Sequence, residues 1–142
     1  MKKASSRSIA ITALTAIALA VGSMPARAQT GELKASIPFS FYAGGQDFAA
    51  GEYTIKRDQV NTALIHLSDG AGHTLTTFAI RAVRQPENGA KLIFNKYGDE
   101  YFLSEVRWTW STMALQFPQS SRERELAKTI TPQQIASRDK RP

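Results

Sequence analysis

Two histidines are the first residues of this 142-residue chain that could do chemistry. His66 and His73 flank Asp69-Gly70, a dipeptide typical of tight hairpin turns. A two-residue loop would place the two imidazoles opposite each other, at a Cβ separation of about 5 Å. A four-residue loop would leave them diagonal. A zinc site takes three or four protein ligands, and the sequence places no third. We interpret both as solvated hairpin residues and expect no metal and no cofactor.

Carboxylates form the second candidate group. Asp99, Glu100 and Glu105 could supply the carboxylate pair of a glycoside hydrolase. However, Asp99 follows Gly98 in a turn, and Glu105 alternates with Arg107, which predicts a solvent-facing edge. The G-x-S-x-G and phosphate-loop patterns are also missing from the sequence. We therefore expect the protein not to be an enzyme, and a hydrolase is the least favoured alternative.

Aromatic residues are the third group. Trp108 and Trp110 share one face of a predicted strand with Phe102 and Val106, and the simplest role for that face is core. If the rings were exposed, their flat apolar faces could stack on sugar rings or lipid chains. The candidate ligand-binding residues are Tyr97, Tyr101, Trp108 and Trp110.

The first 28 residues have the layout of a secretory signal peptide. Lys2, Lys3 and Arg7 precede an uncharged apolar run over residues 9–21, and Ala26-Arg27-Ala28 matches an A-x-A cleavage site. The run is shorter than the roughly 20 residues that span a bilayer. We expect cleavage between Ala28 and Gln29, a periplasmic or secreted protein, and no stable transmembrane anchor after processing. An uncleaved anchor is the alternative.

Removal of this leader changes the charge of the protein. The leader holds four of the 18 basic residues and none of the 12 acidic ones, so the formal charge falls from +6 to +2. Nucleic-acid binding needs a clustered basic surface, which the remainder does not offer. The chain has no cysteine, so its stability must come from apolar burial and backbone pairing.

Short alternating segments separated by turn residues dominate residues 29–118. The first covers residues 33–41, where odd positions are apolar, as in a strand with one buried face. Gly, Pro and Asp turns separate the others, which we place at residues 53–56, 63–68, 74–84, 91–97, 100–110 and 113–117. This spacing predicts an all-β fold, a small antiparallel β-sandwich or barrel of about seven strands.

The chain changes character after Pro118. Ser120-Ser121-Arg122-Glu123 fits a capping box and predicts a helix over residues 121–128. A weaker helix is predicted after Thr131, before a frayed end. The predicted organisation is a signal peptide (1–28), a β-rich domain (29–118) and a C-terminal helical segment and tail (119–142).

Three blocks carry a resemblance to a known group of proteins. IPFSFYAGGQDFAAGEYTI (residues 37–55), KLIFNKYGDEYFLSEVRW (91–108) and SSRERELA (120–127) are similar to blocks in a family of small exported bacterial β-rich proteins of unknown function. Members of that family usually carry one tryptophan after the second block, whereas this chain has Trp108 and Trp110. The resemblance implies export and a β-rich fold, and it implies no activity or site.

These observations favour a non-catalytic structural or binding module of the cell envelope. Its partner is not given by the sequence, and an envelope protein or a glycan are the candidates. A carbohydrate- or lipid-binding accessory domain with an aromatic surface is the main alternative.

Overall fold

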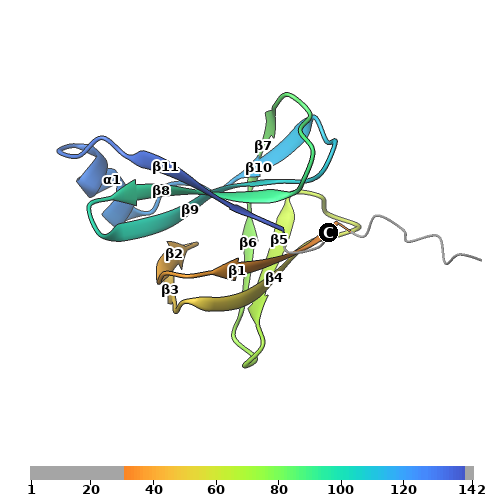
Figure 1. The fold of residues 1–142 in the computed structure, drawn as a ribbon, viewed down its shortest axis with the longest axis horizontal. Helices are drawn as coiled ribbons and strands as arrows, with labels where there is room; N and C mark the ends of the chain where they lie inside the picture. Colours follow the sequence, from red (N-terminus) through yellow and green to blue (C-terminus); the bar gives the residue numbers. More distant parts are fainter. Residues whose placement is uncertain (1–30, 140–142) are drawn as a thin grey trace, which may run out of the picture.

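The computed structural model describes residues 31–139 and shows an all-β protein (Figure 1). Strands hold 54% of these residues and helix 6%, which confirms the predicted class. The elements are β1 (Glu32–Ile37), β2 (Phe41–Ala43), β3 (Gln46–Phe48), β4 (Gly51–Arg57), β5 (Leu64–Asp69), β6 (Thr74–Phe78), β7 (Ile80–Val83), β8 (Lys91–Tyr97), β9 (Glu100–Arg107), β10 (Met113–Gln116), α1 (Ser121–Ala127) and β11 (Gln133–Arg138). The predicted signal peptide and its cleavage site lie outside the described residues.

One antiparallel sheet has the strand order β1-β4-β5-β6. The alternation predicted for its first strand is present, because Leu33, Ala35 and Ile37 are all buried. The register sets one apolar row across the whole sheet, from Leu33 to Ile55, from there to Leu67 on β5 and finally to Leu75 on β6. This row forms one wall of the core.

The second sheet has the order β11-β8-β9-β10-β7, and the short hairpin β2–β3 joins it at β9. Strand β9 is shared: β10 pairs with Glu105–Arg107, and β2 meets β9 in parallel at Tyr42 and Phe102. A register shift in the β8–β9 pairing, after Ile93, lies between these two contacts. Such a bulge bends a strand and allows it to serve two neighbours.

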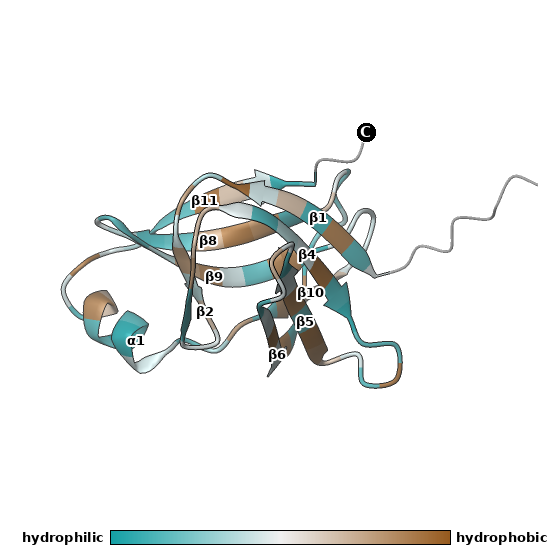
Figure 2. Ribbon diagram, turned by 90° about the horizontal axis from the view of Figure 1, so that it is seen from below, coloured by the Kyte–Doolittle hydropathy of each residue, from teal (hydrophilic) through white to brown (hydrophobic). Residues whose placement is uncertain are grey.

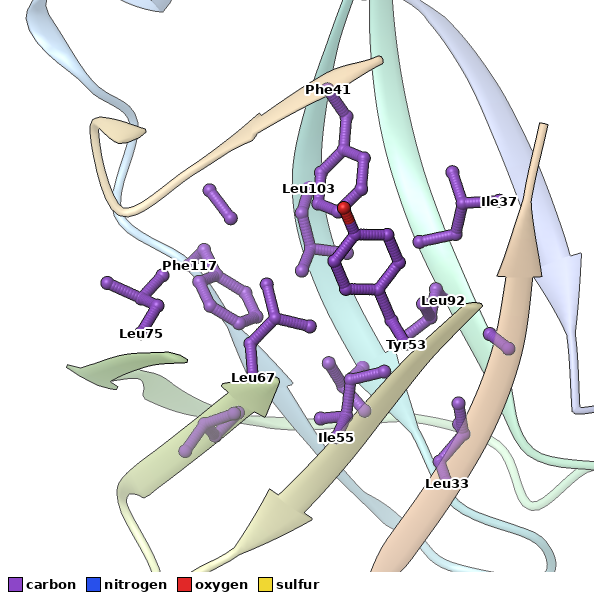
Figure 3. Close-up of a cluster of buried hydrophobic side chains, with 14 of the residues drawn as sticks. Leu33, Ile37, Phe41, Tyr53, Ile55, Leu67, Leu75, Leu92, Leu103 and Phe117 are labelled. Atoms are coloured by element: carbon purple, nitrogen blue, oxygen red, sulfur yellow. The ribbon is translucent and has the colours of Figure 1, made fainter. Parts of the chain in front are cut away.

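Figure 3 shows the core between the sheets, with side chains from β1, β4 and β5 facing those of β8 and β9. Aromatic rings fill one end of it. Phe41 packs edge-on against Tyr53 and Phe94 at centroid distances of 5.1 and 5.4 Å. Figure 2 shows hydrophobic stretches, coloured brown, on β1, β4, β5 and β8.

The strand predicted over residues 74–84 is two strands in different sheets. β6 completes the first sheet and β7 the second, and Ala79 lies at the crossing. Ala79 is buried, and its N–H donates to the carbonyl of Ala63 over 2.8 Å. A small residue that can be buried at this corner lets the chain pass from one sheet to the other. The alternation of apolar and polar residues in the sequence does not reveal such a corner. This split and the extra strands β2, β3 and β11 explain why residues 31–139 form eleven strands rather than about seven.

The helix predicted over residues 121–128 is confirmed as α1, and Ser120 caps it by accepting a hydrogen bond from the N–H of Glu123. The weaker helix predicted after Thr131 is wrong, because this segment forms strand β11. Six residue pairs join β11 to β8. Ladder bonds to the free edge of β8 outweigh a weak local preference for helix. Among residues 31–139 no helix has the length and apolar character needed to cross a membrane.

Candidate functional site

A cleft of about 430 Å³ lies between the β2–β3 hairpin and the turn that joins β8 to β9. Gly44 and Gly45 have positive φ values of 56° and 78°, which permits the tight turn between β2 and β3. The hairpin pairs Phe41 with Phe48 and Tyr42 with Asp47. The lining residues are Ser40, Phe41, Tyr42, Asp47, Phe48, Ala49, Asp99, Glu100 and Tyr101.

The floor of the cleft is apolar and rigid. Phe41 and Phe48 are buried and stack at a centroid distance of 5.4 Å. The hydroxyl of Tyr53, beneath them, donates to the carbonyl of Ala49 over 2.6 Å and holds the end of the hairpin. Burial and the nearby carboxylate of Asp69 raise the pKa of Tyr53, so this donor keeps its proton at neutral pH.

Two half-buried tyrosines form the rim. Tyr42 stacks on Phe102 at a centroid distance of 4.9 Å, and Tyr101 stacks on Phe39 at 3.9 Å. The described residues give neither phenol hydroxyl a hydrogen bond, so both can bond to a ligand. Packing against the phenylalanines fixes the rings in place, which lowers the entropy cost of binding.

Three carboxylates complete the rim. Asp47 and Asp99 are exposed, and within residues 31–139 neither forms an ion pair. Glu100 accepts two hydrogen bonds of 2.5 and 2.8 Å from the guanidinium of Arg122 on α1. These bonds lower the pKa of Glu100 below its usual value, against the smaller effect of burial. The rim is therefore rich in hydrogen-bond acceptors, and Asp47 and Asp99 give it negative charge. Arg122 neutralises Glu100 and lies over the Tyr42 ring at 5.7 Å, and Lys96 lies over the Tyr101 ring at 5.4 Å.

The four aromatic residues proposed from the sequence do not form one surface. Tyr101 lines the cleft, but Tyr97 is buried and donates to Glu123 over 3.3 Å. β9 ends at Arg107, so the tryptophans do not share a strand face: Trp108 packs against the core, whereas Trp110 is 65% exposed with a φ of 55°. A turn follows β9 here, and alternation does not continue through a turn.

The histidine hairpin also differs from both geometries considered. The register pairs Ser68 with Thr74, so His66 lies opposite Thr76. His66 contacts Thr76 at 2.9 Å, and His73 contacts Asp69 at 2.7 Å. In the described part of the chain no three His, Asp or Glu residues are grouped so that they could hold a metal ion.

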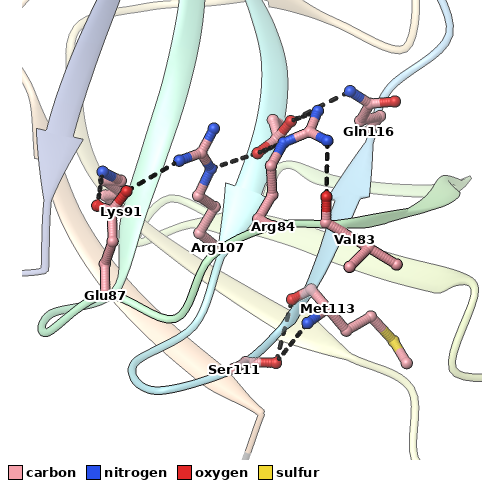
Figure 4. A network of polar contacts seen from close by, with 9 residues as sticks. Val83, Arg84, Glu87, Lys91, Arg107, Ser111, Met113 and Gln116 are labelled. Carbon is pink, nitrogen blue, oxygen red and sulfur yellow. Dashed lines mark hydrogen bonds and ion pairs between the residues drawn. The ribbon is translucent and has the colours of Figure 1, made fainter.

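Glu105 does not face solvent, as its alternation with Arg107 had predicted, because it is buried in a polar network (Figure 4). Arg84 donates to it through two nitrogens, at 3.2 and 2.7 Å, and Gln116 donates at 3.2 Å. Arg107 donates as well. Burial raises the pKa of Glu105, but the hydrogen bonds outweigh burial and the pKa lies below its usual value. The Arg84 side chain, which follows β7 at the edge of the same sheet, reaches across β10 and covers Glu105 on this face.

Sequence reasoning missed Tyr42 and Asp47. Their signal was the Gly44-Gly45 pair, because a two-residue turn at these glycines places Tyr42 directly opposite Asp47. That Tyr101 and the Gly98-Asp99 turn lie beside this hairpin depends on the contact between β2 and β9, which the sequence does not show.

Comparison of the chain with protein-family models, with curated proteins and with solved structures finds no match. The resemblance to a family of exported β-rich proteins therefore stays a prediction. The function has to be inferred from the geometry of the cleft.

Proposed function

We propose that the chain is an exported, non-catalytic binding module of the cell envelope, whose cleft takes a carbohydrate. The observation that carries this proposal is the combination of an apolar floor, Phe41 and Phe48, with a rim of fixed phenol and carboxylate groups. Binding sites for small ligands are typically concave, with apolar walls and a few convergent polar groups.

The rim chemistry favours a ligand that donates several hydrogen bonds. Ionised carboxylates accept hydrogen bonds and donate none, and sugar hydroxyls are suitable donors. Arg122 and Lys96 lie over the rings of Tyr42 and Tyr101, so a sugar would meet the edges and hydroxyls of these tyrosines rather than their faces. A phospholipid with an anionic headgroup fits less well, because the exposed carboxylates of Asp47 and Asp99 would repel it.

The protonation of the carboxylates supports a binding role over hydrolysis. Glycoside hydrolysis needs one carboxyl group that is still protonated near neutral pH. The hydrogen bonds from Arg122 to Glu100 lower the pKa of that group, so it remains ionised. Glu105 is held ionised in the same way by Arg107 and Arg84.

The test of carbohydrate binding uses protein expressed with its own leader and purified after export. Chitotetraose, cellotetraose and maltotetraose are titrated by calorimetry. We expect one of them to bind, and Tyr101→Ala or Asp47→Asn to weaken its binding at least about tenfold, which corresponds to about 1.4 kcal/mol. Trp110→Ala, which removes an exposed ring outside the cleft, is the matched control and should not change the affinity.

Absence of heat with all three sugars would argue against a carbohydrate ligand. An equal loss of affinity in Trp110→Ala and Tyr101→Ala would mean that the ligand binds outside the cleft. Export is tested on the same material, because N-terminal sequencing should read Gln29 as the first residue. A first residue of Met1 on membrane-bound protein would support an uncleaved anchor.

A further inference from the structure

We propose that β7 is a docking edge, which takes an extended acidic segment of another protein as an additional strand. β7 is the last strand of its sheet, and only β10 pairs with it among the described residues. Edge strands of this kind can bind a peptide through main-chain hydrogen bonds, with side-chain contacts giving specificity. This proposal is independent of the cleft.

The register shows which backbone groups of β7 point away from β10. The N–H of Arg84 donates to the carbonyl of Thr112 over 2.8 Å, which continues the β7–β10 register. In an antiparallel pair, alternate residues bond to the same neighbour. Ala82 therefore bonds toward β10 like Arg84, and the backbone groups of Arg81 and Val83 point outward.

One of these outward groups is already occupied. The guanidinium of Arg84 donates to the carbonyl of Val83 over 3.0 Å (Figure 4). The N–H of Val83 and both backbone groups of Arg81 remain for an incoming strand. This is enough for two residues of a partner to bond in register.

Two of the four β7 side chains are large, apolar and open to solvent. Ile80 is 60% exposed and Val83 is 83% exposed, and Phe78, just before the crossing, is 64% exposed. Proteins usually protect a free edge with charges, proline or a covering loop, since it otherwise pairs with other chains. Ile80 and Val83 lie on opposite faces of β7, so an added strand would contact one exposed apolar side chain on each face.

Charge determines the kind of partner. Residues 74–86 contain no acidic residue, and they contain Arg81 and Arg84. Glu105 neutralises Arg84, whereas the side-chain bond of Arg81 goes to the uncharged hydroxyl of Thr62. Arg81 is exposed, so its charge is available to a carboxylate on the directly opposed residue of an added strand.

A second copy of the chain fits this edge less well. Two antiparallel copies of β7 would bring Arg81 of each copy to the same short ladder, with no acidic residue of either β7 between them. Two arginines directly opposite each other are destabilising, and a register that sets Arg81 opposite Val83 instead gives neither charge a partner. An acidic, apolar segment of a different protein provides both the apolar contact and the opposite charge.

The test uses a blocked peptide, valine-threonine-glutamate-valine-threonine, and its twin with lysine in place of glutamate. In antiparallel register the central residue lies opposite Arg81 and the first valine opposite Val83. We expect the glutamate peptide to bind about tenfold more tightly, because attraction replaces repulsion at one cross-strand pair. At saturation, amide exchange measured by NMR should slow at Arg81 and Val83 and stay unchanged at Ala82.

The variant Arg81→Glu should reverse the preference, so that the lysine peptide binds more tightly. Arg124→Glu, a charge reversal on the exposed face of α1, should keep the original preference. Unchanged melting temperatures would show that both variants are folded. Exchange that slows equally at Ala82, or equal binding of both peptides, would overturn the proposal. Sedimentation of the peptide-free protein as a dimer with Arg81 and Val83 protected would also overturn it, in favour of a second copy.

Discussion

The hydroxyl of Tyr97 on β8 donates a hydrogen bond of 3.3 Å to the carboxylate of Glu123 on α1, and both residues are buried. Asn95 donates to the same carboxylate oxygen over 3.0 Å. Glu123 is the last residue of the predicted capping box, yet its side chain points to the sheet. Glu123 therefore joins the helix to β8. The other bond of the capping box, from the N–H of Glu123 to the Ser120 hydroxyl, forms as expected.

Tyr97→Phe should lower the free energy of unfolding by about 1–2 kcal/mol, because it leaves the buried Glu123 with one donor fewer. Tyr101→Phe is the matched control, since its hydroxyl has no hydrogen bond among the described residues, and should change stability by less than about 0.5 kcal/mol. Urea unfolding of both variants measures the difference. Equal effects would mean that the Tyr97 bond contributes nothing.

The Tyr97 hydroxyl also predicts a loss of stability in alkali. Burial, and then the charge of Glu123, raise the pKa of Tyr97. A raised pKa means that the folded protein holds this proton more tightly than the unfolded chain. Its contribution is complete below the ordinary tyrosine value of about 10 and is lost as the pH rises through the folded value. The free energy of unfolding, measured at several pH values between 8 and 11, should therefore fall less steeply with pH for Tyr97→Phe than for the unchanged protein.

Glu105→Gln should cost about 2 kcal/mol, because it removes the shared charge between Arg84 and Arg107. This is below the roughly 3–5 kcal/mol typical of a broken buried ion pair, since the Arg84 side chain is itself 33% exposed. Glu87→Gln is the control: Glu87 also contacts Arg107, but its side chain is 47% exposed, so its removal should cost much less than that of Glu105. Similar losses in the two variants, measured by urea unfolding, would contradict the importance of burial.

The lowered pKa of Glu105 sets the sign of its acid dependence. The folded protein holds this proton less tightly than the unfolded chain, so the contribution is complete above the ordinary glutamate value of about 4.3. It is lost as the pH falls through the folded value. The difference in stability between the unchanged protein and Glu105→Gln should therefore shrink as the pH is lowered from 6 to 3.

Gly44 and Gly45 form a matched pair for the turn that builds one wall of the cleft. Both have positive φ, so alanine at either position costs about 1–2 kcal/mol of backbone strain. A Cβ at Gly44 would also lie 3.0 Å from Leu75, whereas a Cβ at Gly45 would have nothing within 4 Å. Gly44→Ala should therefore be the more destabilising change in thermal unfolding. Equal losses would mean that Leu75 moves aside without cost, and the reverse order would contradict the prediction.

Acrylamide quenching separates the two tryptophans. In Trp108→Phe the remaining fluorescence comes from Trp110, which is 65% exposed, and the quenching slope should be steep. In Trp110→Phe it comes from Trp108, which packs against the core and lies under Arg57 at 5.2 Å, so the slope should be several times smaller. Two equal quenching slopes would contradict the finding that β9 ends at Arg107 and that the two tryptophans differ in exposure.

The sequence by itself determined the elements that depend on neighbouring residues. Alternation placed the buried face of β1, and the Ser120 cap located the start of α1. Both signals are local: a period of two buries one face of a strand, and a cap needs only the next turn of chain.

Tertiary structure decided which distant segments each strand or side chain pairs with or packs against. Residues 133–138 became a strand because β8 offered them an open edge, and residues 74–83 divided because Ala79 could be buried where the chain passes from one sheet to the other. Glu105 is buried because the side chains of Arg84, Arg107 and Gln116, from three different segments, close over it. The cleft itself exists because β2 meets β9 at Tyr42 and Phe102, a contact between residues 60 positions apart, and the free energy of such long-range packing leaves no periodic trace in the sequence.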